Sequence, residues 1–238
     1  MLSSLDRTPV VKNLIIINVL VFVLMNFTSL ARFYDTTALY YFDDSRFEFW
    51  QVFTHMFQHA KLGESIGIMH IVFNMFVLFQ FGTVLETKWG WKRFLFFYLF
   101  AGFGSAFFYN LNLAGISEYA FNTLFPFSTY SDLGFDSFGY AVGASGAISG
   151  IVAAFAFLHP NTELMLMFIP VPIKAKYLVS AFFAFDLIAG LATTLTRVRI
   201  LEGSLAYSDG IAHFAHLGGA VFGFLLVMYW QKNSRNFY

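Results

Sequence analysis

Cysteine is absent from this sequence of 238 residues, and only 12% of its residues are charged. Without cysteine the chain can form no disulfide and offers no thiolate for catalysis, although the absence leaves its compartment open. The 14 basic and 14 acidic residues cancel, so the charge gives no argument for a nucleic acid as partner, and we expect none. Because a soluble domain averages about 25% charged residues, the sequence falls outside that class.

Hydrophobic residues make up 58% of the sequence, with 34 phenylalanines and a mean hydropathy of +0.65. They are spread along the chain in six stretches that approach the roughly 20 apolar residues needed to span a membrane. The stretches are residues 12–31, 66–86, 93–113, 145–159, 175–194 and 212–230. We therefore predict an all-α polytopic membrane protein, with a single domain over residues 1–238 and six transmembrane helices in contact with the lipid bilayer.

The lysine and arginine residues predict the orientation of the bundle. If all six segments cross, the side with both termini carries nine of these residues, and the other side, with longer loops, carries five. The positive-inside rule then places both termini in the cytoplasm, and we expect a bacterial inner membrane. An alternative for the first segment is a signal peptide, because residues 29–31 (Ser-Leu-Ala) are similar to a cleavage site.

Two long loops lie on the predicted outer side. Residues 32–65 are aromatic and amphipathic, and we predict short interfacial helices there. Residues 114–142 are rich in Phe, Tyr, Gly, Ser and Asp and contain no lysine or arginine. Neither loop contains a repeat or a low-complexity linker.

The fourth stretch begins with the sequence GASGAISG and is short, because Pro160 follows Ser145 by only fifteen positions. A helix of this length covers about 22 Å, less than the roughly 30 Å hydrocarbon core. We therefore predict that it starts inside the membrane. The amides of its first turn then need partners from protein or a water-filled cavity, and their partial positive charge suits an oxyanion.

Polar residues in three of the stretches converge at one depth. Ser145 opens the fourth stretch from the outer side, and His216 lies about one turn into the sixth, which enters from the same side. His70 and Asn74 are one turn apart on one face of the second stretch, near its outer end. Polar residues inside a membrane indicate function, since each must face protein or water.

Four segments in this order resemble motifs of the rhomboid family of intramembrane serine proteases. They are FWQVFTHMFQHA (49–60), HIVFN (70–74), GASG (143–146) and AHLGGAVFG (215–223). Each motif alone is weak, but the ordered set is specific and covers most of the chain. The family often has Trp-Arg in the first segment, where this chain has Gln51 after the tryptophan; this departure concerns the polar contacts of the loop.

The resemblance implies a rhomboid-like six-helix bundle that works as a Ser–His dyad without a carboxylate or cofactor. Ser145 would be the nucleophile and His216 the general base, then acid, since a serine hydroxyl needs a base and neutral imidazole suits that task. His70 and Asn74, with the Ser145 amide and Gly143, would stabilise the oxyanion. The implied substrates are single-span membrane proteins that enter laterally beside the fifth helix and unwind at the cut.

Helix packing is the simpler interpretation of the small residues. Gly146 and Gly150 form a small-xxx-small pair, as do Gly219 and Gly223, and such pairs are typical of closely packed membrane helices. Ser145 could then be only a small residue at a helix crossing. Both interpretations can hold, since the glycines would bring the helices together, and Gly143 and Gly146 would let a substrate backbone approach. The alternatives in function are a catalytically inactive relative that binds membrane proteins and an ion or metal transporter. A transporter is favoured by internal pseudo-symmetry, which we do not find.

The remaining polar residues have simpler predicted roles. His55 and His59 have the i, i+4 spacing of metal ligands, but the glutamate of the H-E-x-x-H motif is missing, so we expect loop hydrogen bonds and no metal. We expect Asp186 to be neutral or bonded to a neighbouring helix, with a part in substrate gating as the alternative. Glu86 is expected to tie its helix to adjacent backbone, and His213 to be structural or in contact with water.

Overall fold

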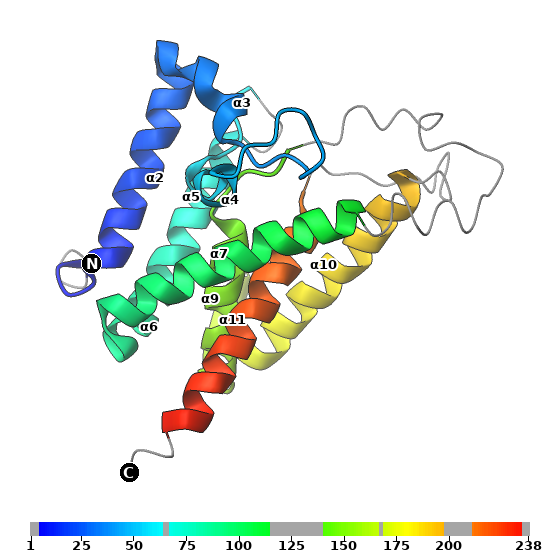
Figure 1. Cartoon of the computed structure of the whole chain (residues 1–238). Helices are drawn as coiled ribbons and strands as arrows, with labels where there is room; N and C mark the ends of the chain where they lie inside the picture. The colour runs from blue at the N-terminus through cyan, green and yellow to red at the C-terminus, as the bar shows by residue number, and fades with distance from the viewer. Residues whose placement is uncertain (1–4, 64–66, 115–139, 167–168, 198–210, 235–238) are drawn as a thin grey trace.

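The computed structural model describes residues 5–63, 67–114, 140–166, 169–197 and 211–234. Within these ranges most of the chain is helical (Figure 1). In chain order the elements are α2 (Pro9–Phe27), η1 (Ser29–Phe33), α3 (Tyr34–Thr37), α4 (Gln51–Thr54), η2 (His55–Phe57), α5 (Gly67–Val77), η3 (Leu78–Gly82), α6 (Thr83–Trp89), α7 (Trp91–Ala114), α9 (Ser145–Leu158), β1 (Glu163–Leu166), β2 (Ile169–Lys174), α10 (Ala175–Arg197) and α11 (His213–Ser234).

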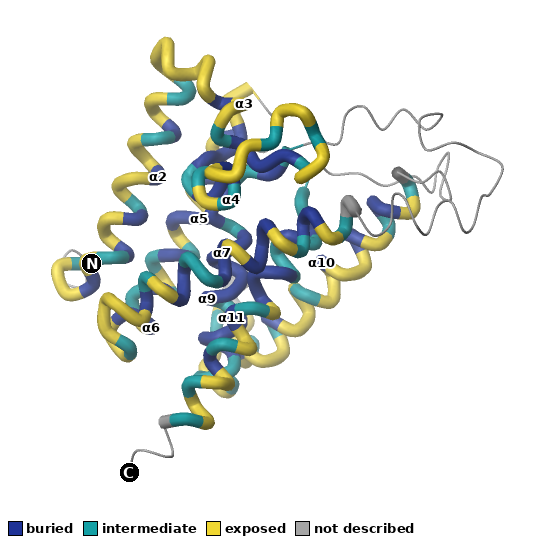
Figure 2. The backbone as a smooth tube through the Cα atoms, in the orientation of Figure 1, coloured by how far each residue is buried: buried dark blue, intermediate teal, exposed yellow. Residues whose placement is uncertain are grey.

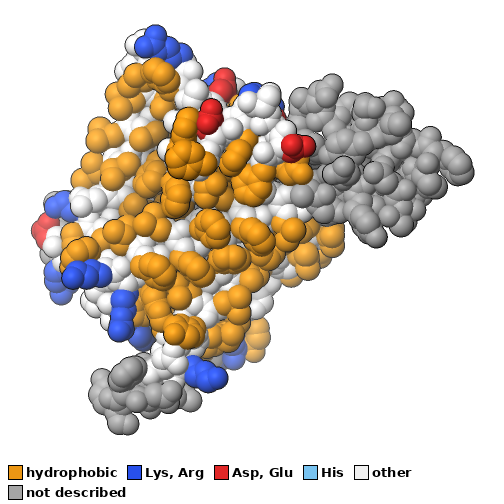
Figure 3. All heavy atoms as spheres, in the orientation of Figure 1, with side chains coloured by type: hydrophobic (Ala, Val, Ile, Leu, Met, Phe, Trp, Pro, Cys, Tyr) orange, Lys and Arg blue, Asp and Glu red, His pale blue; other side chains and the backbone are white. Residues whose placement is uncertain are grey.

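The chain is an integral multi-pass membrane protein, as predicted. Five helices in the described part are long and apolar enough to cross a membrane: Pro9–Phe27, Gly67–Trp89, Trp91–Asn112, Ala175–Thr196 and His213–Asn233. The predicted fourth segment is the shorter apolar helix Ser145–Leu158. Hydrophobic side chains cover most of the face of the bundle seen in Figure 3, and charged ones lie toward its two ends. Both termini lie toward one end of the bundle, and α3 and α4 lie toward the other (Figure 1).

The ends of the first helix differ from the predicted stretch of residues 12–31. Helix α2 starts earlier, at Pro9, because a proline in the first turn has its φ angle preset for a helix and lacks only an amide that would be unpaired there. It ends at Phe27, where Thr28 adopts an extended backbone and its hydroxyl accepts a hydrogen bond from the Leu30 amide. This cap starts the next helix, η1, so residues 28–31 are not part of the span.

A β-hairpin is the one described feature that the all-α prediction did not include. Strands β1 and β2 pair antiparallel, with Glu163 opposite Lys174 and Leu164 opposite Ile173. Helix α9 ends at Leu158 just before Pro160, which cannot continue it. The β-branched residues of the following segment favour an extended chain, and the hairpin leads directly into α10.

Helix α9 is enclosed by the rest of the bundle. Ten of its 14 residues are buried, and the buried backbone in Figure 2 is concentrated where α7, α9 and α11 meet. Glycines allow this approach: a Cβ on Gly150 would lie 2.8 Å from the Gly219 carbonyl oxygen, and one on Gly223 would lie 2.7 Å from the Gly150 Cα. A Cβ on Gly146 would overlap the Ser105 side chain of α7. These contacts fix the position of α9 and α11 relative to each other.

Glu86 joins the first helix to the bundle. Its Oε1 accepts the Val10 amide at 2.9 Å and its Oε2 accepts the Val11 amide at 2.8 Å. These amides lie in the first turn of α2, where no helical acceptor is available, and the helix dipole favours a carboxylate there. The tie to adjacent backbone expected of Glu86 is therefore present.

The first long loop contains short helices, as predicted for residues 32–65. Helices α3, α4 and η2 lie within it and the end of η1 reaches into it. An isolated bridge joins Leu39 to Ala141 just before α9. Most of the second loop, residues 115–139, lies outside the described residues.

Candidate active site

Ser145 is the first residue of α9, and the first loop holds the turn before it. The Gly143 amide donates to the His55 carbonyl at 3.0 Å, and two backbone hydrogen bonds of 3.0 and 2.8 Å join Ala141 to Leu39. Gly143 has φ +127°, a region that residues with a Cβ rarely adopt. The loop and this glycine together turn the chain so that Ser145 points away from its own helix axis toward α11.

The structure brings Ser145 and His216 together. The Ser145 Oγ lies 2.9 Å from His216 Nε2, although 71 positions separate the two residues in the sequence. Helix α11 begins at His213, so His216 lies in its first turn, facing the start of α9. The His216 side chain is 14% exposed, which leaves room for a reactant beside it. A hydroxyl that donates to an unprotonated imidazole nitrogen is the arrangement needed for proton transfer.

His70 lies on the other side of the same turn. A Cβ placed on Gly143 would be 2.8 Å from His70 Nε2 and 3.4 Å from Ser145 Oγ. The Ala60 amide donates to His70 Nδ1 at 3.3 Å, so a neutral His70 carries its proton on Nε2, toward Gly143. The His59 ring packs edge-on against His70 with centroids 5.1 Å apart, and the loop thus sets the orientation of this donor.

Asn74 follows His70 by one turn of α5 and is 5% exposed. Among these described residues, no hydrogen bond joins Asn74 to Ser145, His70 or His216. The structure therefore places Asn74 on the predicted helix face without bringing its amide into contact with the serine.

Asp186 lies in the site, beside the two histidines of α11, and the sequence did not predict this position. It lies on α10, and its Oδ1 is 2.6 Å from His213 Nδ1 and 3.3 Å from His216 Nδ1. The side chains of Asp186 and His213 are 2% and 1% exposed. The expected hydrogen bond between Asp186 and a neighbouring helix is present. It places a carboxylate beside His216, where the resemblance implied a dyad without one. The available signal was a lone acidic residue in an apolar span.

Gln51 keeps the first loop closed in place of the usual arginine. Its Oε1 accepts the Tyr40 amide at 3.2 Å and its Nε2 donates to the Arg46 carbonyl at 2.9 Å. The Arg46 guanidinium bonds Asp44 at 2.6 Å, and this bond lowers the pKa of the Asp44 carboxyl. The polar contacts that the departure from Trp-Arg called into question are thus made by the glutamine.

His55 and His59 are buried in the first loop, and their ring nitrogens are not arranged around a common position for a metal ion. Burial lowers the pKa of His55 to about 4 and, with the charge of His70, that of His59 to about 3. His55 Nδ1 lies 2.8 Å from the Gln51 carbonyl oxygen, so the neutral ring donates to the loop backbone. In the described part of the chain, the group of three residues with ligand atoms close enough to share a metal ion is Asp186, His213 and His216.

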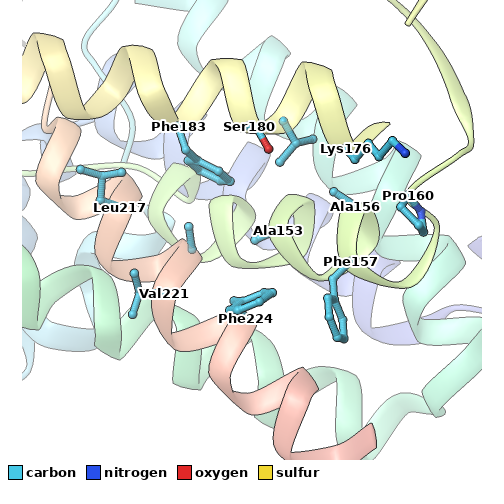
Figure 4. A pocket seen from close by; sticks show the side chains of 12 residues that line it. Ala153, Ala156, Phe157, Pro160, Lys176, Ser180, Phe183, Leu217, Val221 and Phe224 are labelled. Carbon is cyan, nitrogen blue, oxygen red and sulfur yellow. The ribbon is translucent and has the colours of Figure 1, made fainter. Parts of the chain in front are cut away.

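A separate apolar cavity of about 560 Å³ lies between α9, α10 and α11. Its wall is formed by side chains such as Phe157, Phe183 and Phe224, with Lys176 and Ser180 as its polar members (Figure 4). Ser145, His216 and Asp186 are not among the residues that line it. The polar site and this apolar cavity are therefore different features of the bundle.

A comparison with known protein families matches the Rhomboid domain to residues 46–233. Among curated proteins, the chain is 29% identical to RHOMBOID-like protein 1 of Arabidopsis thaliana, over 75% of this chain and 34% of that protein. It is 29% identical to Rhomboid protein 1, mitochondrial, of Saccharomyces cerevisiae, over 68% of this chain and 38% of that protein. It is 29% identical to human Presenilin-associated rhomboid-like protein, mitochondrial, over 96% of this chain and 49% of that protein.

The chain spans between about a third and a half of the length of these curated relatives. Two of the three are mitochondrial by name, so the comparisons give no support to the bacterial inner membrane that we expected. The family match covers the first-loop segment and the helices that carry His70, Ser145 and His216. The chain belongs to the rhomboid family.

Proposed function

We propose that this protein is an intramembrane serine endopeptidase that hydrolyses peptide bonds in or near the transmembrane helices of other membrane proteins. The observation that carries the proposal is the 2.9 Å contact between Ser145 Oγ and His216 Nε2. The two groups come from the starts of different helices in a bundle whose surface is apolar. A nucleophile and its base at this distance are the minimum machinery for acyl transfer.

The proposed reaction uses these two atoms. The Ser145 Oγ attacks the substrate carbonyl carbon while His216 Nε2 takes the hydroxyl proton, giving a tetrahedral intermediate. This intermediate collapses to an ester on Ser145 as His216 returns the proton to the leaving amine. A water molecule, deprotonated by His216 Nε2, then attacks the ester and forms a second tetrahedral intermediate. This intermediate collapses, releases the acid product and takes the proton back from His216, which restores the Ser145 hydroxyl.

The negative oxygen of the intermediate has a place beside Gly143. The point where a Cβ of residue 143 would stand is 2.8 Å from His70 Nε2 and 3.4 Å from Ser145 Oγ. Because glycine leaves that point open, the substrate oxygen can approach the Nε2 proton of His70 and the Ser145 amide. Asn74, one turn further along α5, is proposed as a second donor to this oxygen once a substrate is bound. One donor of this kind is worth about 10²–10³ in rate.

Access and orientation complete the proposal. Single-span membrane proteins would reach the dyad from the lipid beside α10, where the Phe182 ring lies 6.4 Å from the His216 ring. The backbone of a substrate helix is hydrogen-bonded, so the helix must unwind locally before Ser145 can reach a carbonyl. We place both termini in the cytoplasm, since lysine and arginine gather toward the end where the termini lie (Figure 3).

The proposal is tested with the full chain in liposomes, with a panel of single-span substrates and mass spectrometry to locate the cut. Ser145→Ala is expected to lower cleavage by at least about 10³-fold and to abolish labelling by a fluorophosphonate probe. The matched control is Ser149→Ala, one turn further along α9, whose hydroxyl donates to the Ser145 carbonyl at 2.8 Å and does not face His216. Cleavage that survives Ser145→Ala would refute the assignment.

The same experiment separates the alternative function. A wild-type protein that retains substrates but neither cuts them nor reacts with the probe would be a binding protein without catalytic activity. The His216→Ala variant provides a second check, because the proposed mechanism requires the probe reaction to be lost with the base as well as with the nucleophile.

A further inference from the structure

The Asp186 carboxylate is held between two histidines of the next helix. It is 2.6 Å from His213 Nδ1 and 3.3 Å from His216 Nδ1, and α10 carries it into a region where it is 2% exposed. We propose that Asp186 is a positioning residue, which holds His216 in the orientation and tautomer needed to accept the Ser145 proton, and that His213 anchors Asp186 for this task. This inference rests on the proposed protease function.

The hydrogen-bond pattern fixes the tautomer of His216. A neutral imidazole has one N–H, and a carboxylate can only accept. With Asp186 ionised, the contact at Nδ1 therefore keeps the proton of His216 on Nδ1 and leaves Nε2 bare toward the Ser145 Oγ, 2.9 Å away. Without an acceptor on that side, the proton could sit on Nε2, and the ring could no longer act as a base toward the serine.

The carboxylate also suits the charge that develops during the reaction. When His216 takes the serine proton its ring becomes cationic, and both oxygens of Asp186 lie 3.3 Å from its Nδ1. In a shielded site this attraction is much stronger than in water. It favours the imidazolium most when the proton has moved, which is when stabilisation increases the rate.

His213 explains how a carboxylate is kept in this place. An acidic side chain inside a membrane needs partners in the protein, and the shorter of the two contacts is the one to His213. His213 lies one turn before His216 on α11, and their rings are 6.4 Å apart and nearly perpendicular, at 84°. The two imidazoles thus approach one carboxylate from different directions, and His213 restricts its rotation.

Helix α10 covers this group from the outside. The Phe182 ring stacks near His216, and the Phe185 ring meets His213 edge-on with centroids 6.1 Å apart. Phe182, Phe185 and Asp186 have the spacing of one helix face. Gly190, one turn further, lets α10 approach α11, since a Cβ there would lie 2.9 Å from the Phe214 ring. The position of α10 therefore decides whether Asp186 reaches His216.

The simpler interpretation is that Asp186 only ties α10 to α11. The test compares Asp186→Asn with wild type in liposomes, measuring kcat, KM and the rate of fluorophosphonate labelling. A positioning role predicts that kcat and the labelling rate fall by about 10²-fold with KM within about twofold, because the amide can donate to Nδ1 and so favour the wrong tautomer. A purely structural tie would change the thermal stability and the folded fraction but not kcat per folded molecule.

Glu86→Gln is the matched control, since it also removes the charge of a buried carboxylate that joins two helices, toward the other end of the bundle. It is expected to lower stability and leave kcat of the folded protein unchanged. A second pair of variants covers the case in which Asp186→Asn does not fold. His213→Gln keeps a donor for Asp186 and is expected to lose less activity than His213→Phe, which removes the donor.

The outcomes separate the two proposals. An active, labelled wild type with Asp186→Asn equal to it in kcat, or with His213→Gln equal to His213→Phe, would overturn the positioning role and leave the protease function standing. A wild type that neither cleaves nor labels would overturn both.

Discussion

The closest approach of α9 and α11 makes a quantitative prediction about Gly219. A Cβ on Gly219 would overlap the carbonyl oxygen of Gly146 and lie 2.7 Å from its carbonyl carbon, with the Ala101 oxygen 3.4 Å away. The obstacle is backbone, which cannot rotate aside. Gly219→Ala must therefore push the two helices apart.

The size of the displacement follows from these distances. Ordinary contacts of a Cβ begin at about 3.4 Å, so clearing the Gly146 carbonyl carbon alone requires a shift of about 0.7 Å, and clearing the overlapping oxygen requires more. Gly146 adjoins Ser145, and Gly219 is one turn from His216, so the same separation reaches the dyad. If the smaller shift reaches the dyad in full, it lengthens the 2.9 Å contact to about 3.6 Å, beyond hydrogen-bond range. A misplacement of this size costs about 10²-fold in rate.

Stability should change much less than activity. Overpacking costs about 1–3 kcal/mol, and replacing a helical glycine with alanine returns about 1 kcal/mol, so the variant is expected to fold. The assay is kcat/KM for a single-span substrate together with the rate of fluorophosphonate labelling. Gly63→Ala is the control, because no atom lies within 4 Å of a Cβ placed there. A folded Gly219→Ala protein that labels at the wild-type rate would show that this helix contact does not set the geometry of the dyad.

Two predictions concern stability. Glu86→Gln loses one of the two carboxylate acceptors of the α2 amides and should lower the free energy of unfolding by about 1–3 kcal/mol; an unchanged melting temperature in detergent would contradict this. Burial holds the pKa of His55 at about 4, below its ordinary 6.5, so below pH 6.5 the unfolded chain takes up a proton that the folded chain does not. The stability that is complete above pH 6.5 is therefore lost as the pH falls toward 4, by about 2 kcal/mol at pH 5 from this residue. His55→Gln should flatten denaturation midpoints between pH 7 and 5, and a variant with the wild-type pH dependence would count against this cause.

The start of the short helix could be predicted because two local features fix it. Pro160 sets where α9 must end, and Ser145 follows the flexible Gly143. The length of the helix could therefore be predicted from the sequence. Depth along each span predicted that Ser145 and His216 lie at one level, and the resemblance to the rhomboid motifs predicted that they meet. The contact of Asp186 with His216 could not be predicted in the same way. The depth of Asp186 along α10 does not tell which face of that helix is turned toward α11.

The hairpin and the hydrogen bonds of Gln51 could not be predicted from the sequence either. Strands β1 and β2 occupy a segment that carries neither a helical period nor a length that spans the membrane. Gln51 replaces an arginine by using its amide to bond two backbone groups of its own loop. Local patterns predict elements and their depth, whereas partners between distant segments depend on how the helices rotate against one another.

The positions of the polar residues in their helices give a physical reason for a site at this point. Ser145 is the first residue of α9, His216 lies in the first turn of α11, and His70 lies in the first described turn of α5. Each helix start carries a partial positive charge of about half a unit, and inside an apolar bundle this charge is poorly screened. The starts of α9 and α11 meet at the dyad, and together they favour negative charge there. An oxyanion at Ser145 and the carboxylate of Asp186 both gain from this field, so the same arrangement that stabilises the reaction intermediate also makes a buried aspartate tolerable beside it.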